Sequence, residues 1–269
     1  LEVLRLKIAH HTRHDFARPT SYGLQQLRLT PKTRDGQQIE DWALSFEGAV
    51  PQVEFVDQYN NTTILIGLEE GASSLIIKAE GTVVTTDKSG VVGQHGGWTP
   101  LWLYLRSTPL TKAGKSTRAI ASSVKADDGD HVARLHALMH AIEADVRYET
   151  GQTGVLTTAE EAAAAGQGVC QDHTHIFVTC ARLLGYPARY VSGYLMMNDR
   201  VQQDASHAWA EAYVEGLGWV GFDVSNGQSP DERYVRIACG RDYRDAAPVS
   251  GLRHGTGDES MIVSLQIQQ

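Results

Sequence analysis

The first 86 residues alternate apolar and polar side chains in short runs. Leu4, Leu6 and Ile8 are separated by polar residues, and a second run of the same kind surrounds Trp42. Successive side chains of a strand point to opposite faces, so this period of two indicates strands that bury one face. Short strands at this spacing predict a β-sandwich-like N-terminal module, or a strongly twisted sheet, over residues 1–86.

The pattern changes after this module. Residues 87–99 contain four glycines, a composition typical of a linker. Over residues 130–145 apolar side chains recur at steps of three and four, which predicts an amphipathic helix. A second helix is predicted to begin near Cys170 and to end before Gly185 and Pro187. Strand-like segments follow it at 188–195, 206–215 and 219–224.

These elements predict an α+β fold in which the helix carrying Cys170 packs on an antiparallel sheet. We divide the chain into an N-terminal β module (1–86), a linker (87–99), a core (100–240) and a C-terminal segment (241–269). Residues 262–267 alternate once more, and we expect this strand to return to the N-terminal sheet. In that case the two parts form one unit, and truncating the tail should unfold the protein.

Cys170 is the first candidate for chemistry because it stands where the second helix should begin. A helix N-terminus has unpaired N–H groups and a positive dipole end, and both favour the nucleophilic thiolate. The same N–H groups could hold a developing oxyanion. The alternative is a buried, unreactive cysteine, and position alone does not decide between the two.

A predicted hairpin supports a catalytic role for Cys170. With its turn at Gly216 and Leu217, the hairpin places Asp223 opposite residue 209 or 210, within about two positions of His207. An aspartate at that distance can hold an imidazole in one tautomer, and the imidazole can then serve a cysteine as base. The order cysteine, histidine, acid is typical of a papain-type arrangement.

Four segments resemble the core of bacterial transglutaminase-like proteins, in the order in which that family has them. They are Gly-Val-Cys-Gln-Asp (168–172), Ala-Arg-Tyr-Val-Ser-Gly-Tyr (188–194), Ser-His-Ala-Trp-Ala-Glu (206–211) and Gly-Trp-Val-Gly-Phe-Asp-Val-Ser-Asn-Gly (218–227). The segments 10–12, 27–31 and 57–61 resemble the family's β-rich N-terminal module, and 240–251 resembles the part that follows its core. The resemblance implies a papain-like core with Cys170, His207 and Asp223 as its triad. One departure is Asn60, where the family usually has glycine; asparagine also tolerates a positive φ.

The triad and the resemblance predict a cysteine hydrolase, a protease or amidase, that acts on a peptide or protein substrate without a cofactor. The same residues would serve protein-glutamine transamidation if an amine resolved the thioester. A non-enzymatic binding module on the same fold is the competing class. Gln167 and Gln171 are candidate oxyanion donors, although Gln171 could simply face solvent. Trp209 and Trp219 either wall the cleft or belong to the core.

Several residue patterns could indicate a metal site, but each has a better explanation. Cys170, His173 and His175 do not share one helical face, so a polar core contact is the better account of His173. His136 and His140 lack an accompanying H-E-x-x-H pattern. Residues 127–130 are acidic but lack the spaced ligands of a calcium loop, and helix capping explains them better. We therefore predict no metal site; a metal-dependent hydrolase is the third functional alternative.

Net charge and cysteine count limit the classes of binding partner and the cellular compartment. The chain has 24 Lys and Arg against 32 Asp and Glu, a net charge of -8, which argues against nucleic acid. Three cysteines without regular spacing do not resemble a secreted disulfide framework. There is no recognisable signal peptide and no apolar run that could span a membrane, so we expect a cytoplasmic enzyme. The sequence gives no indication of oligomeric state.

Overall fold

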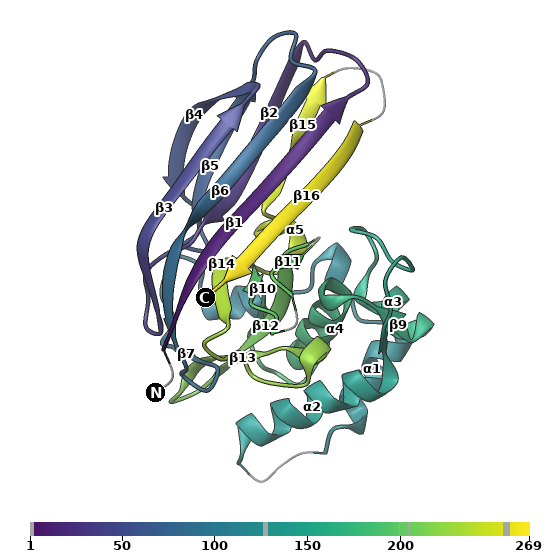
Figure 1. Cartoon of the computed structure of the whole chain (residues 1–269). Coiled ribbons are helices and arrows are strands. Elements are labelled where there is room, and N and C mark those ends of the chain that lie inside the picture. Colours follow the sequence, from purple (N-terminus) through teal and green to yellow (C-terminus); the bar gives the residue numbers. More distant parts are fainter. Residues whose placement is uncertain (1–2, 126–128, 199, 204, 255–258) are drawn as a thin grey trace.

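The computed structural model describes residues 3–125, 129–198, 200–203, 205–254 and 259–269. A two-layer β-sandwich stands on a third sheet that is flanked by helices (Figure 1). One sandwich sheet has the order β11 (Gln202–Gln203), β16 (Glu259–Gln268), β1 (Val3–Phe16), β6 (Ser74–Thr86) and β3 (Gln37–Glu47). The other has the order β15 (Val249–His254), β2 (Tyr22–Thr30), β5 (Thr62–Leu68) and β4 (Ala49–Val56).

The third sheet is the core sheet, with the order β14 (Tyr234–Gly240), β10 (Ala188–Leu195), β12 (His207–Val214), β13 (Gly218–Phe222) and β7 (Val91–Gly93). Its helices are α1 (Lys115–Ser123), α2 (His131–Asp145), α3 (Ala159–Ala165), α4 (Cys170–Leu183) and α5 (Tyr243–Ala246). Short 3₁₀ turns lie at η1 (Leu101–Leu105), η2 (Pro109–Thr111) and η3 (Val224–Asn226), and β8 (Arg147–Tyr148) pairs in parallel with β9 (Gln167–Gly168). None of the described helices is both long and apolar enough to cross a membrane.

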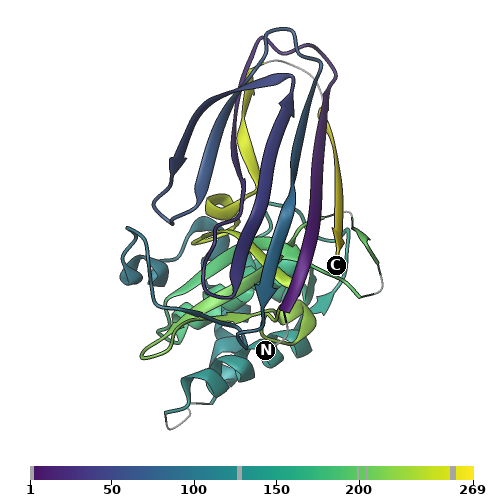
Figure 2. The ribbon, with the colours of Figure 1, turned by 60° about the vertical axis from the view of Figure 1, so that its left-hand side comes forward.

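Strands from both ends of the chain build the sandwich. β16 pairs antiparallel with β1, and β15 pairs with β2, so the last residues of the chain lie beside the first (Figures 1 and 2). β7 lies inside the glycine-rich segment 87–99 and pairs with β13, so this segment adds an edge strand to the core sheet. The segment boundaries drawn from the sequence stay a prediction.

The sandwich strands are longer than the short runs predicted from the sequence. β1 has 14 residues, and its buried side continues from Leu6 and Ile8 through His10, Thr12 and His14. Because polar residues occupy the buried positions after Ile8, the alternation of apolar and polar side chains ends there although the strand continues. Two of them, His10 and Thr12, line a cavity beside Cys170, which explains why this face changes character along the strand.

α4 packs on β12 through the alanine face of that strand. Ile176, Phe177 and Cys180 are fully buried against Ala210 and Ala212. Small side chains at alternate positions of β12 let the helix axis approach the sheet closely. This contact fixes the N-terminus of α4 relative to the beginning of β12, where His207 lies.

The turn at residues 57–61 joins the sandwich to the core sheet. Asn61 Nδ2 donates to the Cys239 carbonyl at 2.8 Å, and the Cys239 N–H donates to Asn61 Oδ1 at 2.9 Å. Asn60 has a φ of 67°, which confirms that asparagine serves where the family usually has glycine. Asn61 is also the first residue of an N-x-T sequon. It is only 2% exposed, and both the oxygen and the nitrogen of its side-chain amide are hydrogen-bonded, so the folded protein does not offer it for glycosylation.

Candidate active site

Cys170 is the first residue of α4, and its local environment explains why the helix begins there. The Asp172 carboxylate accepts from the Val169 N–H at 2.8 Å and from Thr153 Oγ1 at 2.6 Å. A side chain on Gly168 would place its Cβ 2.6 Å from that of Asp172, so only glycine leaves room for this cap. The first N–H groups of the helix, at Cys170 and the two residues after it, have no partner within the helix.

His207 and Asp223 form a buried ion pair. His207 Nε2 lies 2.6 Å from Asp223 Oδ2, with 14% of the His207 side chain and 1% of the Asp223 side chain exposed. Phe222 pairs with Ala210, so the next residue, Asp223, falls at the level of position 209, as the hairpin predicted. Asp223 Oδ2 also accepts from Asn226 Nδ2 at 2.7 Å and from the Tyr234 hydroxyl at 2.8 Å.

Charge and burial act in opposite directions on this pair. Burial lowers the pKa of His207, but the Asp223 carboxylate, its hydrogen bond and the adjacent Cys170 raise it, with a net pKa of about 10. Burial raises the pKa of Asp223, but the His207 charge and the hydrogen bonds from His207, Asn226 and Tyr234 together lower it by more, so the pKa of Asp223 lies below its ordinary value. The pair is therefore an imidazolium beside a carboxylate at neutral pH.

Cys170 and His207 face two cavities, and both residues line each of them. The first cavity, about 310 Å³, has mainly apolar walls that include Tyr243, Val249 and Met261. The sandwich strands β1, β15 and β16 close its far side. The second cavity, about 560 Å³, has mixed walls on the Tyr148, Gln203 and Asn226 side.

The wall that the sandwich contributes is uncharged at neutral pH. His10 Nδ1 lies 2.8 Å from the Tyr194 hydroxyl, and burial, helped by the neighbouring His11 charge, lowers the pKa of His10 to about 4. The first cavity is therefore an apolar recess with a neutral imidazole on its far side.

The other predicted site residues occupy different places. Gln171 lines the first cavity, and its Nε2 donates to the Val155 carbonyl at 3.3 Å. Gln167 lines neither cavity; its Nε2 lies 3.5 Å from Gln152 Oε1. Trp209 and Trp219 are 3% and 1% exposed, belong to one core cluster and line neither cavity beside Cys170, so their packing is that of core residues.

The histidines considered for a metal make other contacts. His173 Nδ1 lies 2.9 Å from Ser225 Oγ and its Nε2 lies 3.0 Å from the Val146 carbonyl, while His175 Nε2 accepts from the Tyr243 N–H at 3.1 Å. In the part of the chain that the structure describes, no three His, Cys, Asp or Glu side chains are grouped to hold a metal ion. Of the acidic run 127–130, residues 127 and 128 lie outside the described ranges; Asp130 caps α2 by accepting from the Ala133 N–H at 2.9 Å.

Asn226 and Tyr234 are functional candidates that sequence reasoning did not single out. Asn226 lies within the segment 218–227 that carried the resemblance, so a signal existed there. Tyr234 begins β14, which pairs with β10 and not with the strands that carry His207 and Asp223. Only the folded sheet reveals that it reaches Asp223.

Family models match most of this architecture. Residues 118–224 match the transglutaminase-like superfamily, and residues 6–84 match the bacterial transglutaminase-like N-terminal region. An uncharacterized protein of Mycobacterium leprae is 26% identical over 284 residues, with 98% of each chain covered. Uncharacterized proteins of Mycobacterium bovis and Mycobacterium tuberculosis are 36% identical over 138 residues, which is 48% of this chain and 44% of theirs.

A solved structure has the same fold. A "putative cysteine protease" from Cytophaga hutchinsonii superposes on 100% of this chain and 91% of its own, with a TM-score of 0.79 and 22% identity. At this identity the likeness shows the fold alone, and it confirms the predicted α+β class with a papain-like core. On these two family matches, the core of the chain (residues 118–224) belongs to the transglutaminase-like superfamily, and residues 6–84 ahead of it are a bacterial transglutaminase-like N-terminal region.

Proposed function

We propose that the protein is a cysteine hydrolase that cleaves peptide or amide bonds, with Cys170 as nucleophile, His207 as acid and base, and Asp223 as the orienting carboxylate. The observation that carries the proposal is the position of Cys170 at the first turn of α4, beside a histidine that Asp223 holds at 2.6 Å. Asp223 occupies Nε2 of the ring, which leaves Nδ1 for proton transfer.

The chemistry follows from these positions. The Cys170 thiolate attacks the carbonyl carbon, and the first N–H groups of α4 stabilise the negative oxygen of the tetrahedral intermediate. His207 gives its proton to the leaving amine, the C–N bond breaks, and a thioester remains on Cys170. His207, now neutral, takes a proton from water, which attacks the thioester. The carboxylic acid leaves, and the thiolate–imidazolium pair is restored.

The cavities support hydrolysis over transamidation. The apolar walls of the first cavity, with Val249, Met261 and Val263, suit an apolar side chain on the acyl side of the scissile bond. In transamidation the glutamine carboxamide is itself the group that Cys170 attacks, so this recess would receive only the two side-chain methylenes of glutamine, which fill less of it than a leucine or phenylalanine side chain. The second cavity has mixed walls, with Gln203 and Asn226 among its polar residues, and these suit a peptide leaving group and water.

Iodoacetamide labelling across pH, with each cysteine quantified separately by mass spectrometry, tests the nucleophile. We expect Cys170 to react fastest and to stay reactive well below the ordinary thiol pKa of about 8.5. Cys180 is the internal control, because burial raises its pKa to about 12. His207→Ala should remove most of the advantage of Cys170. Equal rates for Cys170 and the buried Cys180 and Cys239 would overturn the proposal and favour a binding role.

A substrate comparison then separates the two reactions. Peptide amides with leucine or phenylalanine on the acyl side are compared with glutamine peptides, each with and without an excess of a primary amine. Hydrolysis predicts a free acid as the main product even with the amine present. An amine adduct on glutamine as the main product would show transamidation instead.

A further inference from the structure

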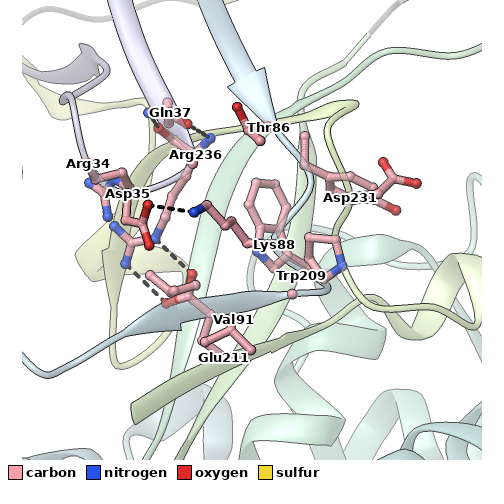
Figure 3. A pocket seen from close by; sticks show the side chains of 15 residues that line it. Arg34, Asp35, Gln37, Thr86, Lys88, Val91, Trp209, Glu211, Asp231 and Arg236 are labelled. Carbon is pink, nitrogen blue, oxygen red and sulfur yellow. Dashed lines mark hydrogen bonds and ion pairs between the residues drawn. The ribbon is translucent and has the colours of Figure 1, made fainter. Parts of the chain in front are cut away.

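A second group of buried charges lies on the face of the core sheet opposite α4. Arg189 on β10 and Arg236 on β14 both bind Glu211 on β12, with Nε–oxygen distances of 2.5 and 2.8 Å. Glu211 is fully buried, and only 6% and 8% of the two arginine side chains are exposed. Figure 3 shows Arg236 extending towards Glu211, with dashed lines joining the two groups.

A third guanidinium has no such partner. Arg34 comes from the loop between β2 and β3, and its buried Nε has no hydrogen-bond partner among the described residues. It lies close to Arg236 (Figure 3). Burial, and then the positive charge of Arg236, lower the pKa of Arg34 to about 9. The fold therefore holds a cation in a place that opposes its charge.

These three arginines converge on one small cavity of about 150 Å³. Tyr59 and Asn60 from the sandwich and Gln94 from the segment after β7 complete its polar walls. None of the residues lining it lines either cavity beside Cys170. It is therefore a separate site at the junction of the sandwich and the core sheet.

The local charges do not balance. Three guanidinium groups face one carboxylate, Glu211, which leaves two positive charges. Other carboxylates of this region are already paired: Asp35 with Lys88 at 3.0 Å, Asp57 with Arg28 at 3.1 Å, and Asp231 with Arg233 at 2.5 Å. Lys32, which donates to Asn60 at 2.9 Å, adds a further positive charge at the rim. Guanidinium groups bind tetrahedral and planar oxyanions through paired N–H donors, and a dianion would neutralise the excess.

We propose that this cavity binds a phosphate-type dianion, held between Arg34, Arg189 and Arg236. Arg34 lines the cavity and has no carboxylate partner among the described residues, and Asn60 and Gln94 contribute side-chain amides to its wall. The anion would bridge the sandwich loop and the core sheet, because its ligands come from both. Binding should therefore stabilise the folded protein.

Thermal unfolding of the full chain, titrated with inorganic phosphate at constant ionic strength, tests the site. Sulfate has the same shape and charge, acetate is the monovalent carboxylate arm, and O-phosphoserine presents the same group on a larger molecule. We expect a saturable rise in Tm with phosphate and sulfate and little with acetate. A rise with O-phosphoserine as well would assign a phosphate monoester as a ligand; a rise with phosphate and sulfate but not with O-phosphoserine would assign the free dianion.

Three variants locate the effect. Arg34→Gln removes a donor without breaking a described ion pair and should weaken phosphate binding by at least about tenfold. Asn60→Asp keeps the size and the left-handed backbone while adding a negative charge, and it should weaken binding even if R34Q does not fold. Arg118→Gln, on the exposed face of α1, removes a remote positive charge and should match wild type. The absence of a saturable rise, an equal rise with acetate, or full binding by N60D together with a folded R34Q would overturn the proposal.

Discussion

His207 Nε2 lies 2.6 Å from Asp223 Oδ2, and the same oxygen accepts from Asn226 and Tyr234. All three neighbours are donors, and they converge on one oxygen of the carboxylate. An amide in place of this carboxylate could present its oxygen to the same three donors. The geometry thus offers a way to remove the charge of Asp223 while keeping its hydrogen bonds.

Asp223→Asn should lower the reactivity of Cys170 by removing that charge. Without the carboxylate, burial dominates, and the pKa of His207 should fall from about 10 towards or below 6.5. Fewer molecules then hold an imidazolium beside the thiolate, so labelling of Cys170 near pH 6.5 should slow by at least about tenfold. Asp231→Asn, which removes a partly buried carboxylate that is paired with Arg233 and not with His207, is the control. Wild-type labelling in D223N would show that the charge of Asp223 has no part in activating Cys170.

The ion pair also predicts how stability depends on pH. The pKa of His207 is raised from 6.5 to about 10, so its contribution is complete below pH 6.5 and is lost as pH rises towards 10. The pKa of Asp223 is lowered from 3.8, so its contribution is present above pH 3.8 and is lost as pH falls below it. The free energy of unfolding of wild type minus that of His207→Gln should be largest between these limits, near pH 4–6.5.

Urea unfolding of both proteins from pH 4 to pH 10 measures this difference. His140→Gln, in which an exposed histidine beside Glu143 is replaced, should show no comparable decline. A difference between wild type and H207Q that stays constant up to pH 10 would contradict the raised pKa of His207.

The sequence could predict the central geometry because it depends on counting. The period of two and the turn at Gly216 set the position of Asp223 relative to His207, and the glycines before Cys170 mark the start of α4. Tyr234 could not be predicted, because the sheet order β14-β10-β12-β13 separates its strand from β13 by two others. Nothing in a linear pattern gives that order.

The interior of the sandwich was only partly predictable for a related reason. Apolar alternation identifies β1 only as far as Ile8, because the polar residues His10 and Thr12 occupy the next buried positions. Their polarity reflects the cavity that they line together with Cys170. Arg34 and Arg236 were equally hidden, because they are 202 positions apart (236 − 34) and meet only where the sandwich contacts the core sheet.

Glu211→Gln should destabilise the protein strongly. The substitution leaves the buried guanidinium groups of Arg189 and Arg236 without their counter-charge, which costs about 3–5 kcal/mol in comparable buried pairs. Chemical denaturation at pH 7 measures the loss, and Glu40→Gln, which breaks the exposed pair with Arg5, should change little. Equal stabilities of E211Q and E40Q would show that Glu211 does not hold the two arginines in the folded state.

Ile267→Ala tests whether the last strand holds the sandwich on the core. Ile267 is 1% exposed and belongs to a buried cluster that joins residues of both parts, among them Leu6, Ile8, Val235 and Ile237. Removing its buried methyl and methylene groups should lower the free energy of unfolding by about 2–5 kcal/mol. Ile262→Ala is the matched control on the same strand: that side chain is 61% exposed, and its loss should change stability by no more than about 0.5 kcal/mol.

Because β16 also supplies Met261 and Val263 to the cavity beside Cys170, I267A should lower the labelling rate of Cys170 only at temperatures where it begins to unfold. Two separate transitions in I267A, with the core unfolding at the wild-type temperature, would show that the sandwich and the core are independent units.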